Sequence, residues 1–289
     1  MPYFQNKNAK IYYEDVGQGD PIIANHGLME DGTYWSESGV TAKLAEKYRM
    51  ISIDMRAHGR TIVDGRPFGF DADTMAADFD ALADFLEIDR FHLLTHATGG
   101  MVGVRYAMTR SERLISLILT DTGSATIPDF YTKQSNIPEP TEKGVAAWTK
   151  WVSTGSVEDL IKEVHHHPGE YLFKMAEHPN NEGMWKIYEG PLRRHDSKAI
   201  AKFRTVFYSD LDPRIEGLRQ IKCPTLILLG EFDIVFLKPS EIMANEIPDV
   251  RHVIIDGVGH MTAIEAPERT TKEILDFLKT VDQTGKDKK

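Results

Sequence analysis

The spacing of apolar residues along this chain changes repeatedly between that of strands and that of helices. Segments with apolar residues three or four positions apart are typical of helices that bury one face. They are expected at residues 41–47, 74–86 and 267–279. Short apolar runs typical of buried strands lie at residues 21–24, 50–53, 114–119, 224–229 and 250–255. Strands that alternate with helices predict an α/β fold, a mostly parallel twisted sheet with helices on both faces.

This alternation stops in the middle of the chain. Between residues 125 and 220 we find helical patterns at 142–152, 156–165 and 197–208, with no convincing strand between them. Such a block predicts an inserted helical cap. We therefore expect a core built from residues 1–124 and 221–289, with a cap at 125–220. Near the N-terminus, polar and apolar residues alternate at residues 3–14, which predicts two short antiparallel strands.

Residues 91–107, FHLLTHATGGMVGVRYA, predict a strand, a tight turn and a helix. The apolar run covers the strand, and the helix is expected to open at Gly99 and Gly100. In a nucleophile elbow, the residue at the apex of such a turn has a strained backbone, and its side chain stands above the sheet. Here the apex is Ala97, whose methyl group can attack nothing.

Composition narrows the possible partners. The 44 acidic and 34 basic side chains give a net charge of -10, which disfavours binding to nucleic acid or to an anionic membrane. The single cysteine, Cys223, excludes an internal disulfide and a cysteine-based zinc cluster. The N-terminal residues lack the apolar block of a signal peptide, and no run is long enough to span a membrane. We expect a cytoplasmic protein.

Two chemically active residues follow later strands. Asp233 lies after the strand at 224–229, and His260 lies after the strand at 250–255. The carboxyl ends of parallel strands line the crevice in which such sheets bind ligands, so both residues should approach Ala97. With Ala97 in the nucleophile position, the chain order is nucleophile, acid, histidine.

On these motifs, residues 10–280 resemble the alpha/beta-hydrolase superfamily, in its cap-bearing esterase and lactonase-like branch. Thr95-His96-Ala97-Thr98-Gly99 is similar to the elbow G-x-S-x-G of that family, with threonine for the first glycine and alanine for serine. The resemblance implies a hydrolase of carboxylic esters or lactones that uses a Ser-Asp-His triad. In such a triad the histidine removes the serine proton and the aspartate orients the histidine.

The resemblance also assigns roles to residues outside the triad. It places the oxyanion-hole N–H groups at Leu28 and Thr98. Histidines 26, 58 and 96 match family residues that support these loops. We expect the substrate-binding residues to be Gly27, His26, Trp148, Trp151 and Trp185. The aromatic cap side chains suggest an apolar or aromatic small-molecule substrate.

Ala97 has two competing explanations: natural loss of the nucleophile, or a deliberate serine-to-alanine change that would hold an intact substrate. A strained apex costs on the order of 1–3 kcal/mol, and a chain freed from catalysis is expected to relax the turn or lose the partner residues. Asp233 and His260 are both retained. This favours an inactivated Ser→Ala variant at position 97.

Two other functions stay open on the same fold. One is a carbon–carbon bond hydrolase or another non-ester catalyst, and the other is a non-catalytic protein that binds a small molecule. We expect no cofactor, since no nucleotide loop or flavin fingerprint is present. We expect no metal either, because consecutive residues of a helix, as in His165-His166-His167, point in different directions. The sequence does not indicate the oligomeric state.

Overall fold

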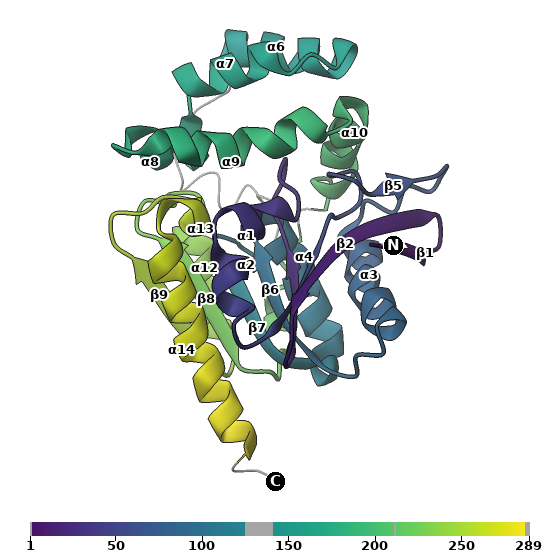
Figure 1. The fold of residues 1–289 in the computed structure, drawn as a ribbon, viewed down its shortest axis with the longest axis vertical. Coiled ribbons are helices and arrows are strands. Elements are labelled where there is room, and N and C mark those ends of the chain that lie inside the picture. Colours follow the sequence, from purple (N-terminus) through teal and green to yellow (C-terminus); the bar gives the residue numbers. More distant parts are fainter. Residues whose placement is uncertain (1, 125–140, 211, 287–289) are drawn as a thin grey trace.

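The structure is a computed structural model that describes residues 2–124, 141–210 and 212–286 (Figure 1). Its strands are β1 (Tyr3–Asn6), β2 (Ala9–Gly17), β3 (Pro21–Asn25), β4 (Arg49–Ile53), β5 (Ile62–Val63), β6 (Phe91–His96), β7 (Leu114–Thr120), β8 (Thr225–Gly230) and β9 (Val250–Ile255). Its helices are α1 (Thr33–Glu37), α2 (Val40–Leu44), α3 (Ala72–Phe85), α4 (Ala97–Arg110), the 3-10 turn η1 (Ser111–Arg113), α6 (Glu142–Thr154), α7 (Glu158–His166), α8 (Gly169–Glu177), α9 (Asn181–Arg194), α10 (Ser197–Phe207), α11 (Ile215–Leu218), α12 (Leu237–Glu246), α13 (Thr262–Glu265) and α14 (Pro267–Lys286).

The strands form one mixed sheet in the order β1-β2-β4-β3-β6-β7-β8-β9, with β5 paired to β2. From β4 to β9 every pairing is parallel, and β2 pairs antiparallel with β1, β4 and β5. The predicted fold class is confirmed. The central position of β6 places the turn after it in the middle of the carboxyl edge of the sheet.

Successive strand residues bury their side chains on opposite faces of the sheet, as the two-residue period of a strand requires. In β6, Leu93 packs into the core beneath α3 and α4, whereas Leu94 packs into the core beneath α1, α2 and α14. Both leucines are fully buried. Helices therefore cover both faces, which is why the parallel strands are apolar throughout rather than alternating.

Helices α6–α10 form a layer of their own above the carboxyl edge of the sheet (Figure 1). Three of them, α6, α7 and α10, lie within two residues of predicted segments, but α8 and α9 were not predicted. Helix α9 contacts α1 and α13, the segments that follow β3 and β9. The predicted cap boundaries at 125 and 220 stay predictions, since residues 125–140 lie outside the described part of the chain.

Within the described residues, no helix combines the length and the apolar character needed to cross a membrane.

Candidate active site

Ala97 occupies the sharp turn between β6 and α4. Its backbone φ is +46°, in the left-handed region that residues with a Cβ rarely adopt. Helix α4 begins at Ala97 itself, rather than at Gly99 and Gly100 as predicted. The glycines serve close packing: a Cβ on Gly99 would lie 2.3 Å from the carbonyl oxygen of His26. The turn thus combines backbone strain with close contact to the segment after β3.

His260 and Asp233 form a hydrogen-bonded pair. Nδ1 of His260 lies 3.0 Å from Oδ2 of Asp233, a carboxylate that is completely buried. The backbone N–H of Phe236 donates to the other carboxylate oxygen at 3.2 Å, and the Phe236 ring stacks on the imidazole. A carboxylate that accepts the Nδ1 proton leaves Nε2 as the nitrogen able to take up a proton from a bound molecule.

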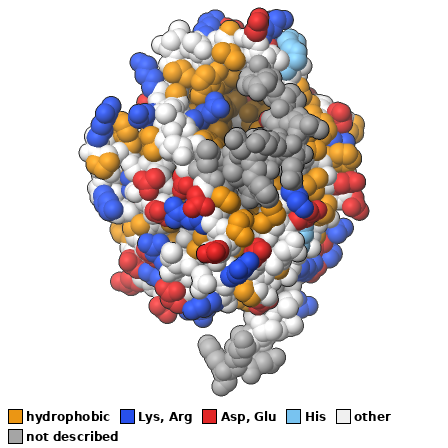
Figure 2. Space-filling model, turned by 180° about the vertical axis from the view of Figure 1, so that it is seen from behind, with side chains coloured by type: hydrophobic (Ala, Val, Ile, Leu, Met, Phe, Trp, Pro, Cys, Tyr) orange, Lys and Arg blue, Asp and Glu red, His pale blue; other side chains and the backbone are white. Residues whose placement is uncertain are grey.

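Ala97 and His260 line the same cavity, which has a volume of about 720 Å³. Its walls come from the carboxyl edge of the sheet and from helices α6–α10, and they are mostly apolar. The lining residues are Leu28, Met29, Glu30, Ala97, Thr98, Met101, Trp148, Val164, Pro168, Tyr171, Leu172, Tyr188, Ala201, Arg204, Thr205, Tyr208, Phe236, His260 and Met261. Hydrophobic side chains also gather around a hollow on the back of the molecule (Figure 2).

The segment after β3 approaches the apex closely. A Cβ on Gly27 would lie 3.1 Å from Cβ of Ala97 and 2.9 Å from Oε2 of Glu30, so a larger residue would crowd both side chains. His26 holds the segment: its Nδ1 is 2.8 Å from the Gly27 carbonyl oxygen, and its Nε2 accepts the backbone N–H of Met55 at 3.0 Å. His26 is completely buried, the described cavity lining does not include it, and its two hydrogen bonds hold the loop after β3.

A family profile described as "alpha/beta hydrolase fold" matches residues 20–267. The protein belongs to the alpha/beta-hydrolase family.

Several known proteins are similar to this chain over most of their length. A non-heme chloroperoxidase of Burkholderia pyrrocinia is 28% identical, with 81% of this chain and 82% of the relative covered. A structure of a carboxylesterase from Nitrososphaera gargenis superposes with a TM-score of 0.80 at 18% identity, covering 98% of this chain and all of the other. The enol-lactonase of Burkholderia xenovorans LB400 gives a TM-score of 0.77 at 22% identity, with 96% and 100% covered. At these identities the structures establish the fold alone.

A second group of charged residues lies directly behind the apex of this alpha/beta hydrolase. His96 is completely buried between two carboxylates: its Nε2 is 3.3 Å from Glu30, and its Nδ1 is 3.3 Å from Asp121. Glu30 also accepts the backbone N–H of Gly27 at 2.6 Å. On the other side, Asp121 accepts the hydroxyl proton of Thr262 at 2.5 Å. The group thus ties the segment after β3 to the elbow and to the segment that follows His260.

The two carboxylates decide the charge of His96. Burial alone would lower the pKa of this imidazole, but Glu30 and Asp121 raise it to about 10, so His96 is a cation at neutral pH. Burial raises the pKa of Glu30 as well, and His96 more than offsets this, so that the pKa of Glu30 lies below its ordinary value. Histidine 96 was expected only to support the loop, and Glu30 was not singled out. The position of Glu30, three residues after Gly27, was the one sequence signal for its role beside the elbow.

The three predicted substrate-binding tryptophans occupy different surroundings. Trp148 lines the cavity, with the guanidinium of Arg204 4.4 Å from its ring centroid. Trp151 is buried in a cluster between α6, α7, α9 and α10, and Trp185 is buried in another cluster, where it packs against His165 and Tyr188. The described cavity lining includes neither of them. Both side chains contribute to packing among the helices, because helices stacked above a sheet need a core of their own.

Two histidines of the run at 165–167 pair with different carboxylates. His165 pairs with Glu189 at 2.7 Å and stacks on Trp185, whereas His167 pairs with Glu163 at 3.0 Å. The two imidazoles serve separate carboxylates, in keeping with the divergent directions of neighbouring helical residues.

Proposed function

We propose that this chain has the site of a hydrolase of carboxylic esters or lactones, with a Ser-Asp-His arrangement in which Ala97 replaces the serine. One observation carries the proposal: an apex residue with a φ of +46° lines the same cavity as a histidine that is hydrogen-bonded to a buried aspartate. Because alanine offers no nucleophile, the chain with Ala97 is inactive or nearly so as an esterase.

Each residue would have a defined task once position 97 carries a hydroxyl. Nε2 of His260 would take the serine proton as the oxygen attacks the carbonyl carbon, and Asp233 would stabilise the imidazolium that forms. The backbone N–H groups of Leu28 and Thr98 would donate to the oxyanion of the tetrahedral intermediate. His260 would then return the proton to the leaving alcohol, and water would hydrolyse the acyl-enzyme.

The cavity supports a small, largely apolar substrate. Its volume of about 720 Å³ lies within the range of ligand pockets, which runs from roughly 300 to 1,000 Å³. Trp148 and Tyr171 offer aromatic walls. The guanidinium of Arg204, held over Trp148, adds a cation at one wall, so a substrate with an aromatic part and a carboxylate matches this lining well.

The test is the substitution Ala97→Ser. Loss of the serine from such a triad costs on the order of 10⁶-fold in kcat, so the serine variant should hydrolyse p-nitrophenyl butyrate and aryl lactones at rates several orders of magnitude above the alanine protein. The left-handed backbone is already in place, so the hydroxyl needs no rearrangement of the turn.

Mass spectrometry of the same variant should show a transient acyl adduct on residue 97. The double variant Ala97→Ser with His260→Ala is the matched control, and it should return to the alanine level. Absence of both hydrolysis and adduct with esters, thioesters and lactones would overturn the proposal.

A second candidate rests on the intact Asp233–His260 pair beside an apex without a nucleophile. Such a pair can act as a general base without a covalent step, which suits a carbon–carbon bond hydrolase or another non-ester catalyst. Here the protein with Ala97 is itself active, and His260→Ala abolishes that activity. A vinylogous diketone, tested with the alanine protein, separates this candidate from the first and from a protein that only binds its ligand.

A further inference from the structure

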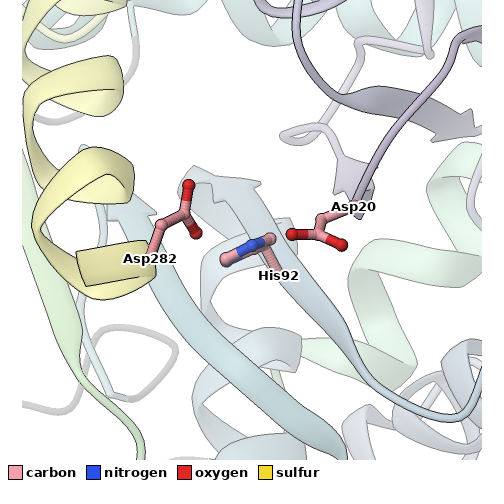
Figure 3. A group of neighbouring side chains, drawn as sticks. All are labelled: Asp20, His92 and Asp282. Carbon is pink, nitrogen blue, oxygen red and sulfur yellow. The ribbon is translucent and has the colours of Figure 1, made fainter. Parts of the chain in front are cut away.

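Three metal-ligand side chains from distant parts of the chain meet at the amino end of the sheet (Figure 3). Asp20 precedes β3, His92 is the second residue of β6, and Asp282 lies on α14. One ligand atom of each residue lies within 4.8 Å of the other two. Figure 3 shows the imidazole between the two carboxylates, one from the sheet side and one from the helix.

His92 is oriented as a ligand would be. The imidazole is completely buried, and its Nδ1 lies 2.8 Å from the hydroxyl oxygen of Ser116. When Nδ1 donates its proton to that oxygen, Nε2 carries the free lone pair. Among the described residues, Nε2 of His92 has no hydrogen-bond partner although it is buried. Buried polar atoms without a partner are exceptions in folded proteins, and each calls for an explanation.

The surroundings support the same geometry. The Tyr48 hydroxyl donates to Oδ2 of Asp282 at 2.8 Å, and the Tyr48 ring contacts His92 edge-on. Ser116 and Tyr48 are thus each hydrogen-bonded to one ligand side chain. In metal sites such outer partners fix the direction of the ligands.

We propose that Asp20, His92 and Asp282 bind a divalent transition-metal ion of the zinc type. The donor set decides the class of ion: Mg²⁺ and Ca²⁺ prefer oxygen ligands alone, whereas an imidazole nitrogen with two carboxylates suits Zn²⁺. Zinc bonds to these atoms are about 2.0–2.2 Å long, so the three ligand atoms, which lie within 4.8 Å of one another, would draw closer together around the ion. Water completes the coordination.

The role of this ion is structural. His92 is near the start of β6 and Ala97 follows its end, and five residues of strand span about 17 Å. An ion at this distance cannot contact a substrate beside His260. It would join the loop before β3 and helix α14 to the central strand, and so hold the C-terminal helix on the sheet.

Isothermal titration calorimetry with ZnCl₂ tests the proposal on tag-free protein freed of metal by EDTA dialysis. The unaltered protein should bind one Zn²⁺ at this site, and Asp20→Asn or Asp282→Asn should weaken that binding by at least about 100-fold. Asparagine keeps the shape of the side chain. Asp276→Asn is the matched control, because Asp276 lies on the same helix, is half-exposed and pairs with Lys272.

Two further measurements exclude binding elsewhere and misfolding. His165→Ala with His167→Ala should leave the site intact, because these histidines belong to another surface. Zn²⁺ should raise the Tm of the unaltered protein and leave that of Asp20→Asn unchanged, while the two proteins melt alike in EDTA. Equal Zn²⁺ affinity in the aspartate variants, no binding to the unaltered protein, or a preference for Mg²⁺ or Ca²⁺ would overturn the proposal.

Discussion

The two ends of strand β6 carry the same residue type in opposite states. His96, at the carboxyl end, has its pKa raised to about 10 by Glu30 and Asp121, against the effect of burial. His92, at the amino end, has its pKa lowered to about 4, because burial outweighs the attraction of Asp20. Both imidazoles are completely buried.

The difference lies in the distance and burial of the carboxylates. Those beside His96 are themselves buried and lie 3.3 Å from its nitrogens, so water screens them little. Asp20 is exposed, and solvent weakens its pull on His92. One end of the strand thus holds a protonated imidazole within a charge network, and the other holds a neutral imidazole that faces two carboxylates. Burial alone does not set the charge of a histidine.

The largest expected effect is on catalysis: a change at the carboxyl edge of the sheet should lower kcat, whereas a change at the amino end of β6 should not. In an Ala97→Ser background, Asp233→Asn should lower kcat by about 10⁴-fold, because His260 loses the acceptor that orients it. Asp89→Asn, which alters an exposed side chain just before β6, should leave kcat unaltered. Ester hydrolysis by both variants measures the contrast, and equal rates would remove Asp233 from the mechanism.

The charge network behind the apex should dominate stability at the carboxyl end. Glu30→Gln leaves a buried imidazolium with one carboxylate fewer, so the free energy of unfolding should fall by about 3–5 kcal/mol. Asp15→Asn breaks a half-exposed pair with Arg49 and should cost no more than about 1 kcal/mol. Urea denaturation of both variants checks this order, and a loss below 1 kcal/mol for Glu30→Gln would mean that His96 is neutral.

The two histidines should give pH effects of opposite sign. The unfolded chain has an ordinary histidine pKa near 6.5. As pH falls from 6.5 through 4, only the unfolded state binds a proton at residue 92, so the stability that His92 contributes is lost by up to about 3 kcal/mol. As pH rises from 6.5 through 10, only the folded state keeps the proton at residue 96, so that contribution is lost on the alkaline side.

Unfolding free energies measured in EDTA at pH 4, 7 and 10 separate these effects. The difference between the unaltered protein and His92→Gln should shrink from pH 7 to pH 4. The difference between the unaltered protein and His96→Gln should shrink from pH 7 to pH 10. Parallel pH curves for the unaltered protein and either variant would contradict the assigned charge state of that histidine.

The elements with a strong local signal could be predicted from the sequence. The apolar run, the small-residue turn and the chain order of Ala97, Asp233 and His260 led to the fold, and the structure places Ala97 and His260 on one cavity. Helix α9 was missed because Gly190 and Pro191 lie inside it, and both residues normally interrupt a helix. Strand β5 has two residues, too few to show a period.

The charge networks could not be predicted, because they depend on which segments the fold brings together. Nothing near Asp20 in the sequence indicates that Asp282, on the last helix, faces it across His92. The same holds for Glu30 and Asp121, which reach His96 from two different strand ends. Distances along the chain carry no information about such contacts until the order of the strands is known.

The hydrogen bond between Thr98 and Tyr208 has a mechanical consequence. The hydroxyl oxygens are 2.7 Å apart, and they connect the first turn of α4 with the end of α10. A movement of the end of α10 away from α4 would have to break this hydrogen bond. Any ligand entry that moves α10 is therefore coupled to the rigidity of the backbone next to residue 97. A ligand that binds without breaking this hydrogen bond meets the more rigid site.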